Sequence, residues 1–288
     1  MRLGAPVFDW STPDEWAFNH VRKGFGAAYW PLGEEATLKE EEAFLEAAQR
    51  HGIVIAEVGI WNNLLDCNVI RREENIQYAI RRLRTADRAG ARCCVNISGS
   101  RSTFWDGPHP DNLSEETFRQ VVETTKRIID EAAPKRTCYT LEPMPWMLPY
   151  DVESLQRLIK AVDRPHFAVH VDMCNLVNAF QKVYSTGEMT RAFFDAFRPL
   201  IRSIHAKDTI LREDRLTLHI DEAIPGRGVF DYDTLLRECH RLGDIPVMAE
   251  HLQTPEEYDE ATGFLLDKAA SLGIPFDPIS KHKCIDKQ

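Results

Sequence analysis

The 288-residue sequence has no long apolar run, no excess of positive charge and no C-x-x-C pair among its seven cysteines. No stretch reaches the about 18 apolar residues of a membrane-spanning helix, so no membrane partner is expected. The net charge of −10 argues against a nucleic-acid partner. The amino terminus also lacks a secretory pattern, and several cysteines lie in apolar runs. We therefore expect a cytoplasmic protein with reduced thiols.

Glycine-rich phosphate-binding motifs are missing as well. No G-x-G-x-x-G follows the early predicted strands, which disfavours a doubly wound open sheet, the second candidate fold. Without a Walker-type loop, the sequence favours a substrate that is not phosphorylated. Low-complexity tracts and linker-like segments are missing too. Residues 1–288 are therefore expected to form a single domain.

What the chain does have is a repeated local pattern. A helical segment ends in glycine and an apolar strand follows at once, as in "QRHG", "DRAG" and "HRLG". Glycine just past a helix suits the left-handed conformation, and the apolar run after it is typical of a buried parallel strand. Capping-box sequences at Thr12, Thr37 and Thr254 mark helix starts. The chain thus alternates helices and buried strands.

Eight strands can be counted along the chain, with helical patterns in most of the gaps. Eight such units in about 280 residues, without a break in composition, predict an α/β fold that is a single (β/α)₈ TIM barrel. The strands are expected near residues 3–8, 25–30, 53–60, 92–97, 137–142, 167–172, 201–206 and 246–251.

Four consecutive predicted strands each end in a residue that can bind a metal: Glu142, Asp172, His205 and Glu250. In a barrel of this kind the active site lies at the carboxyl ends of the strands. A single carboxylate there can be a helix cap or part of a surface ion pair. Three on one rim would repel one another unless a cation or proton compensates. The set predicts a site for Mn²⁺, Mg²⁺ or Co²⁺, and Zn²⁺ also fits.

The motifs around these residues carry a family resemblance that covers nearly the whole chain. "LEP", "HVDM", "IHAKD", "PGRGVFDYDTLL" and "AEHL" together resemble the xylose isomerase-like TIM-barrel family of sugar isomerases and epimerases. Hydroxypyruvate isomerase, the ketose 3-epimerases and endonuclease IV are relatives. The resemblance implies that Glu142, Asp172, His205 and Glu250 bind the metal and that Arg227 contacts the substrate. Because family members are often dimers or tetramers, it also allows a homo-oligomer.

Two features depart from the family pattern. Many members have a histidine three residues after the aspartate of strand six, where this chain has Asn175. That histidine often contacts substrate or acts as an acid–base group. Endonuclease IV needs further histidines for three metals, but strands three and four here end in "VGIWNN" and "NISGS". With the acidic net charge, this argues against DNA repair.

The predicted site suggests a mechanism. A cation holding adjacent hydroxyl and carbonyl oxygens of a sugar-like substrate would stabilise a cis-enediolate. Glutamates on opposite faces can then remove and return the proton next to the carbonyl. The family's epimerases use both glutamates in this way, which implies that role for Glu142 and Glu250. Lys207 shares the strand parity of His205 and can reach substrate, while Asp208 faces away and orients a neighbour or caps a loop.

Other candidates have two interpretations each. His170 lies one layer below Asp172 and either touches substrate or is a core histidine. Glu57 either binds a substrate hydroxyl or pairs with a basic residue inside the barrel. Arg227 either binds substrate or fixes its loop by a salt bridge. Tryptophans near strand ends either form a wall for a sugar ring or pack loops on the barrel; they are Trp30, Trp61, Trp105 and Trp146.

Three functions follow, in order of preference. The first is a metal-dependent isomerase or epimerase acting on a ketose or related carbonyl sugar. The second is a lyase on the same scaffold, such as a decarboxylase, dehydratase or C-deglycosylase acting on an oxo-sugar or oxo-sugar acid. Two features support this alternative. Asn175 replaces the usual histidine, and the basic residues Lys207 and Arg227 could hold a carboxylate. The third is a barrel that only binds a sugar or a partner, which the intact set of four candidate ligands disfavours.

Overall fold

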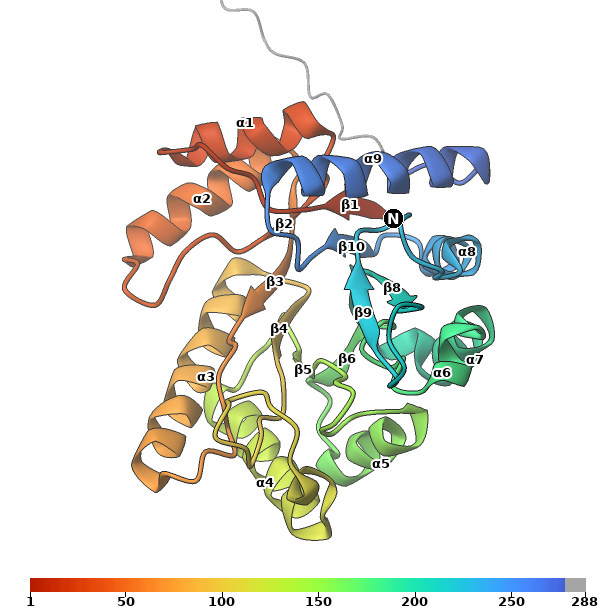
Figure 1. Cartoon of the computed structure of the whole chain (residues 1–288). Coiled ribbons are helices and arrows are strands. Elements are labelled where there is room, and N and C mark those ends of the chain that lie inside the picture. Colours follow the sequence, from red (N-terminus) through yellow and green to blue (C-terminus); the bar gives the residue numbers. More distant parts are fainter. Residues whose placement is uncertain (278–288) are drawn as a thin grey trace, which may run out of the picture.

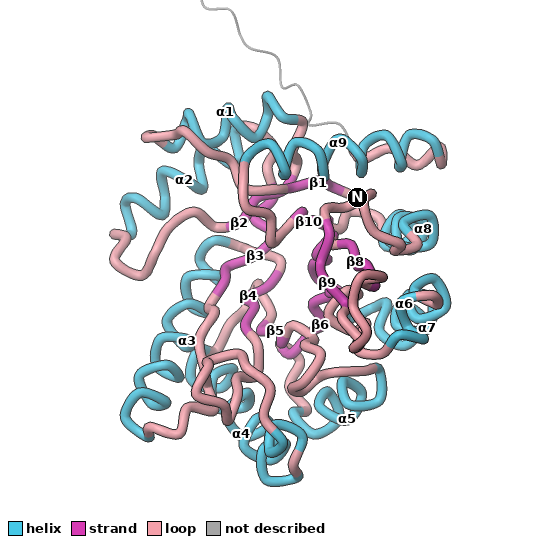
Figure 2. Tube along the Cα trace, viewed as in Figure 1, coloured by secondary structure: helices cyan, strands magenta, loops and turns pink. Residues whose placement is uncertain are grey.

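The computed structural model describes residues 1–277, which form a closed parallel barrel of eight strands surrounded by helices (Figure 1). The strand order around the barrel is β1-β10-β7-β6-β5-β4-β3-β2, and every neighbouring pair is parallel. Figure 2 shows the strands as an inner ring with the helices outside it. The predicted (β/α)₈ fold is therefore confirmed.

The elements have the following bounds. The barrel strands are β1 (Arg2–Gly4), β2 (Ala27–Tyr29), β3 (Val54–Gly59), β4 (Cys93–Asn96), β5 (Tyr139–Leu141), β6 (Phe167–Asp172), β7 (Ile201–Ala206) and β10 (Pro246–Ala249). A separate antiparallel hairpin comprises β8 (Asp208–Leu211) and β9 (Ile220–Ala223). The α-helices are α1 (Pro13–Lys23), α2 (Leu38–Arg50), α3 (Val69–Ala89), α4 (Glu115–Ala132), α5 (Val152–Val162), α6 (Phe180–Val183), α7 (Thr186–Phe197), α8 (Tyr232–Leu242) and α9 (Pro255–Ser271). Two 3₁₀ turns are η1 (Pro110–Leu113) and η2 (Arg198–Leu200).

Local sequence signals account for these boundaries. The three predicted capping boxes form: Thr12, Thr37 and Thr254 each accept a hydrogen bond from the backbone of a glutamate that bonds back to the cap. Gly90 ends α3 with φ of 63°, a conformation that costs glycine little. All eight predicted strands are found, although several are shorter than predicted and β1 ends at Gly4.

The core lies between the strands and the helix layer. Every residue of β4 and β6 is buried, because each strand has a helix on one side and the barrel interior on the other. Cys93, Cys94 and Cys239 are buried free thiols that pack as small apolar side chains. Within residues 1–277, the helices are all too short or too polar to cross a lipid bilayer.

The hairpin of β8 and β9 is not among the eight predicted strands, because the polar segment 212–226 reads as a loop in the sequence. Asp208 explains how the segment is held. Its carboxylate accepts backbone N–H groups of Thr209, Gly226, Gly228 and Phe230 at 2.8–3.1 Å. These contacts agree with the expectation that Asp208 caps a loop. A side chain that is 1% exposed thus ties the hairpin to the loop before α8.

We expect Asp208→Ala to lower the free energy of unfolding by about 3 kcal/mol, because four backbone donors would lose a charged acceptor in a buried place. Urea denaturation followed by circular dichroism would measure the change. Asp214→Ala is the matched control, since Asp214 pairs with Arg212 on the exposed part of the same hairpin. Equal stabilities of the two variants would contradict the role given to Asp208.

Candidate active site

Strand register brings the four predicted ligands together at the carboxyl ends of the strands. Asp172 is the last residue of β6 and pairs in register with His205 of β7. Glu142 directly follows β5, and Glu250 directly follows β10, whose Met248 pairs with His205. One ligand atom from each of the four lies within 4.8 Å of the others. The prediction that these side chains converge is therefore confirmed.

His205 lies at the centre of this group, which we call the carboxylate cluster: Glu142, Asp172, His205 and Glu250. Its Nδ1 atom is 2.9 Å from Glu250 Oε2, 3.5 Å from Glu142 Oε1 and 3.8 Å from Asp172 Oδ2. Glu142, Asp172 and His205 are at most 3% exposed, whereas the Glu250 side chain is 16% exposed. Glu250 is therefore the member most open to solvent.

Lys207 also faces the cluster. Its Nζ atom is 2.8 Å from Asp172 Oδ2, 3.0 Å from Glu250 Oε2 and 3.7 Å from Glu142 Oε1. Burial lowers the pKa of Lys207, but these carboxylates outweigh burial and hold the pKa well above its usual range. The lysine is therefore an ammonium ion that offsets part of the negative charge of the cluster.

The atoms that face the middle of the cluster fit a divalent cation. Asp172 Oδ2, His205 Nδ1 and Glu250 Oε2 are buried, and none of them makes a well-aligned hydrogen bond to another described residue, although Lys207 Nζ and His205 Nδ1 lie within ion-pair distance of the carboxylates. Buried polar atoms are normally satisfied, so a further cation among these atoms would complete the compensation that Lys207 begins. Three carboxylates and one imidazole form a donor set suited to Mn²⁺, Mg²⁺, Co²⁺ or Zn²⁺. The residues present fit the predicted cation.

The electrostatic environments of the two glutamates differ. Burial raises the pKa of Glu142 to about 7, despite the opposing charges of His205 and Lys207. Burial also raises the pKa of Glu250, but the positive charges of His205 and Lys207 outweigh burial and hold this pKa well below its usual range. Two carboxyl groups of one cluster thus have different proton affinities.

Glu57 lies beneath the cluster and is only 1% exposed. Its Oε2 atom is 3.1 Å from His205 Nε2, and the Ser203 hydroxyl donates to Oε1. His170 Nδ1 is 3.6 Å from Glu57 Oε1. Glu57 therefore pairs with histidines and a serine, not with the lysine or arginine that was the alternative to a substrate contact. Its place below His205 keeps it out of the cavity.

His170 is fully buried in the barrel interior. Neither ring nitrogen has a hydrogen-bond partner among the described residues, and the ring packs edge-on against His205 with 4.1 Å between centroids. Burial, together with the charge of His205, lowers the pKa of His170 to about 4, so the ring is neutral. This is the position of a core histidine one layer below the cluster.

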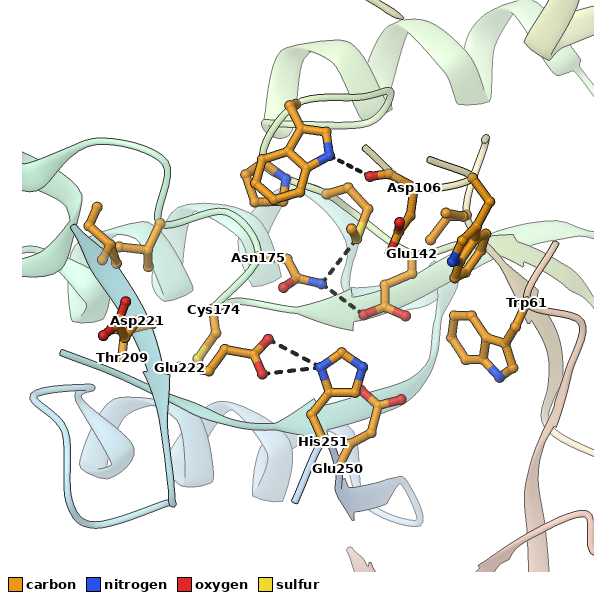
Figure 3. A pocket seen from close by; sticks show the side chains of 17 residues that line it. Trp61, Asp106, Glu142, Cys174, Asn175, Thr209, Asp221, Glu222, Glu250 and His251 are labelled. Atoms are coloured by element: carbon orange, nitrogen blue, oxygen red, sulfur yellow. Dashed lines mark hydrogen bonds and ion pairs between the residues drawn. The ribbon is translucent and has the colours of Figure 1, made fainter. Parts of the chain in front are cut away.

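Asn175 does reach the cluster. Its Nδ2 atom donates to Glu142 Oε1 at 2.9 Å (Figure 3), and its backbone N–H donates to Asp172 Oδ1 at 3.0 Å. The residue that departs from the family pattern therefore holds two of the candidate ligands in place.

A cavity of about 510 Å³ opens above Glu142 and Glu250 (Figure 3). Two residues that the sequence reasoning missed line it: Glu222 of β9 and His251. His251 Nδ1 is 3.1 Å from Glu222 Oε2, and this carboxylate raises the pKa of His251. Strand alternation would turn His251 away from the side of Glu250, but a φ of +60° redirects the chain. The only signal in the sequence was its adjacency to Glu250.

The remaining candidates separate into two groups. Trp61, Trp105 and Trp146 line the cavity, as a wall for a sugar ring would require, whereas Trp30 belongs to the hydrophobic core. Arg227 does not line the cavity. Its exposed guanidinium pairs with Glu260 of α9 at 2.5 and 2.6 Å, which is the loop-fixing salt bridge considered as the alternative.

The chain is similar to known proteins in its sequence pattern and in its structure. A family model described as "Xylose isomerase-like TIM barrel" matches residues 15–268. No curated protein matches the sequence. Among solved structures, endonuclease IV from Thermus thermophilus has a TM-score of 0.72 and 16% identity, covering 94% of this chain and 100% of that chain.

Two further solved structures are similar. The 3-keto-D-glucoside 4-epimerase YcjR from E. coli has a TM-score of 0.66 and 16% identity, covering 95% of this chain and 99% of that chain. A xylose isomerase-like TIM-barrel protein from Mycobacterium smegmatis, solved in complex with magnesium, has a TM-score of 0.65 and 18% identity, covering 91% and 90%. Identities this low support a shared fold and no more.

Proposed function

Because the chain belongs to the xylose isomerase-like TIM-barrel family, we propose that it is a divalent-metal-dependent isomerase or epimerase acting on a ketose or related carbonyl sugar. The observation that carries the proposal is the carboxylate cluster at the base of a cavity. Its two glutamates, Glu142 and Glu250, directly follow β5 and β10. In the barrel, β6 and β7 lie between these two strands. Glutamates so placed can approach a bound substrate from different sides.

In this proposal Glu142, Asp172, His205 and Glu250 hold the cation. When bound, the cation would polarise the carbonyl of the substrate and offset the negative charge that develops there. One of Glu142 and Glu250 accepts the proton from the carbon next to the carbonyl, and the other returns a proton from the other side.

Neighbouring side chains assist this transfer. Asn175 positions Glu142 through the bond to Oε1, and the Lys207 ammonium stabilises negative charge near Asp172 and Glu250. The tryptophans and other apolar groups of the cavity wall exclude water from the reacting carbon.

The test is proton NMR in D₂O with Mg²⁺-reconstituted protein and a panel of ketoses and 3-oxo-sugar acids. The expected result is deuterium at the carbon next to the carbonyl, with a new sugar appearing, and loss of both on adding EDTA. Release of CO₂, water or an aglycone would assign the site to the lyase class instead. Exchange that persists without metal would contradict the proposal.

Lys207 provides a further prediction, because its ammonium contacts the carboxylates that would hold the cation. Lys207→Met should tighten Mg²⁺ binding at least about tenfold, since unit charges about 4 Å apart interact by about 4 kcal/mol at an effective dielectric constant of 20. Turnover should fall, because a group that stabilises developing negative charge is lost. Isothermal titration calorimetry measures the affinity, with Lys268→Met as the surface control. Weaker Mg²⁺ binding in Lys207→Met would contradict the prediction.

A further inference from the structure

A second cavity of about 620 Å³ adjoins the first at the carboxyl end of the barrel. It lies between the segment after β3 and the segment after β4. Trp61 and Trp105 line both cavities, so the two spaces meet at these rings. The Trp61 and Trp105 side chains are large and apolar, yet 40% and 41% exposed. Exposed aromatic rings between two cavities suggest a surface on which a ligand lies.

The backbone is built to keep Trp61 in this place. Trp61 has φ of +52°, which is an outlier for a bulky residue and is strained. Gly59 makes room for the ring: a Cβ atom at that position would lie 2.2 Å from Trp61 Nε1. Figure 3 shows Trp61 on one side of the first cavity, opposite Glu222 and Asp221. The strained backbone at Trp61 and the close approach of its ring to Gly59 do not serve the hydrophobic core, because Trp61 is not part of the core.

Buried amides hold the two segments together. The Asn63 amide donates to Ser100 O and accepts the Ser100 N–H, both at 2.9 Å, which joins the segment after β3 to the segment after β4. Asn62 and Asn96 exchange two hydrogen bonds of 3.1 Å in the same way. The tryptophan surface is therefore held in place before any ligand binds, which lowers the entropic cost of binding.

The lining of the second cavity is polar but carries little net charge. Hydroxyl groups of Ser102 and Thr103 and the amide of Asn75 line it. Its charged groups, Asp66 and Arg71, pair with each other, with Arg71 Nη2 2.9 Å from Asp66 Oδ1. Such a surface suits a neutral, hydroxyl-rich group. A phosphate or carboxylate would have to compete with Asp66 for the guanidinium.

We propose that the substrate is an uncharged two-ring glycoside. Its carbonyl-bearing sugar unit lies in the first cavity against the carboxylate cluster, and its second, hydroxylated ring crosses Trp61 and Trp105 into the second cavity. The proposal rests on the proposed function and names its substrate class. A first cavity of about 510 Å³ already falls within the roughly 300–1,000 Å³ of sites for drug-sized ligands, and the second extends it.

Cys67 provides a direct test, because it is an exposed thiol that lines the second cavity. Mg²⁺-loaded protein would be treated with N-ethylmaleimide, and modification of Cys67 would be followed by peptide mass spectrometry. Cys138 serves as the internal control, since it precedes β5 at the opposite end of the barrel. The probes are the ketose disaccharides lactulose, maltulose and cellobiulose, compared with fructose, tagatose and psicose.

At least one disaccharide is expected to slow modification of Cys67 about tenfold or more without affecting Cys138. By calorimetry that disaccharide should bind at least about tenfold more tightly than each monosaccharide. Trp105→Ala should remove this preference, whereas Trp146→Ala, altered only in the first cavity, should weaken both kinds of sugar. Monosaccharides binding as tightly as disaccharides, disaccharide binding that leaves Cys67 unprotected, or no disaccharide binding would each overturn the proposal.

These outcomes are separable from those of the proposed function. If a disaccharide binds and protects Cys67 but no sugar exchanges deuterium, the two-ring site stands and the isomerase proposal fails. If ketohexoses exchange deuterium with metal while disaccharides neither bind nor protect Cys67, the isomerase proposal stands and the two-ring substrate is wrong.

Discussion

Glu142→Gln and Glu250→Gln should each lower metal-dependent deuterium exchange by about 10²–10⁴-fold, the usual contribution of a general acid or base. Each glutamine keeps one oxygen for a cation and nearly the same volume, but it cannot carry a proton between substrate and solvent. The NMR assay in D₂O measures the rate, and circular dichroism checks that the barrel remains folded.

Loss of metal could mimic loss of proton transfer, so Mg²⁺ affinity must be measured for each variant and the rate repeated at saturating Mg²⁺. A rate restored by excess Mg²⁺ would show that the glutamate serves only as a ligand. Asp106→Asn is the matched control, because Asp106 lines the same cavity outside the carboxylate cluster. Full activity in either glutamine variant would refute the proton-transfer scheme.

Glu57→Gln should weaken Mg²⁺ or Mn²⁺ binding by about 10–100-fold, the usual effect of removing a partner of a metal-binding histidine. Burial raises the pKa of Glu57, but His205 and His170 outweigh it and lower the pKa, so Glu57 is a carboxylate. It pairs with His205 Nε2, so Nδ1 is the ring nitrogen that faces the carboxylate cluster and that would bind a cation held there. Glu57 is thus a positioning residue.

Metal affinity distinguishes this role from a purely structural one. Glu41→Gln provides the comparison, because Glu41 is also buried and is held by Arg88 and Thr85 in the helix layer. Both variants are expected to lose some stability in thermal denaturation, but only Glu57→Gln should lose metal affinity in calorimetry. Equal affinities in the two variants would show that Glu57 does not orient His205.

Local signals in the sequence determine the barrel. The capping boxes at Thr12, Thr37 and Thr254 and the apolar strand runs act over a few residues, and the structure reproduces them. The carboxylate cluster was also predictable. In a closed parallel barrel the carboxyl ends of all strands meet on one rim, so a polar residue after each of four buried strands has to converge with the others.

Only the tertiary structure decides what surrounds the cluster. Strand parity places His170 one layer below Asp172 and directs Lys207 to the side of His205, but it does not set the depth of Glu57 or the partners of these side chains. The structure places Glu57 and His170 below His205, and it places Lys207 against the carboxylates. Depth depends on the register between strands, which is set by contacts between residues far apart in the chain.

The cavity wall depends on tertiary structure even more. Glu222 reaches His251 because the β8–β9 hairpin folds over the barrel, and Trp61 and His251 point inward because each has a positive φ. Arg227, between two glycines, matches a family motif, yet a salt bridge to Glu260 holds it outside the cavity. The sequence determines which groups stand at the strand ends, because that follows from local periodicity and barrel closure. Packing between distant segments decides which of them meet a substrate.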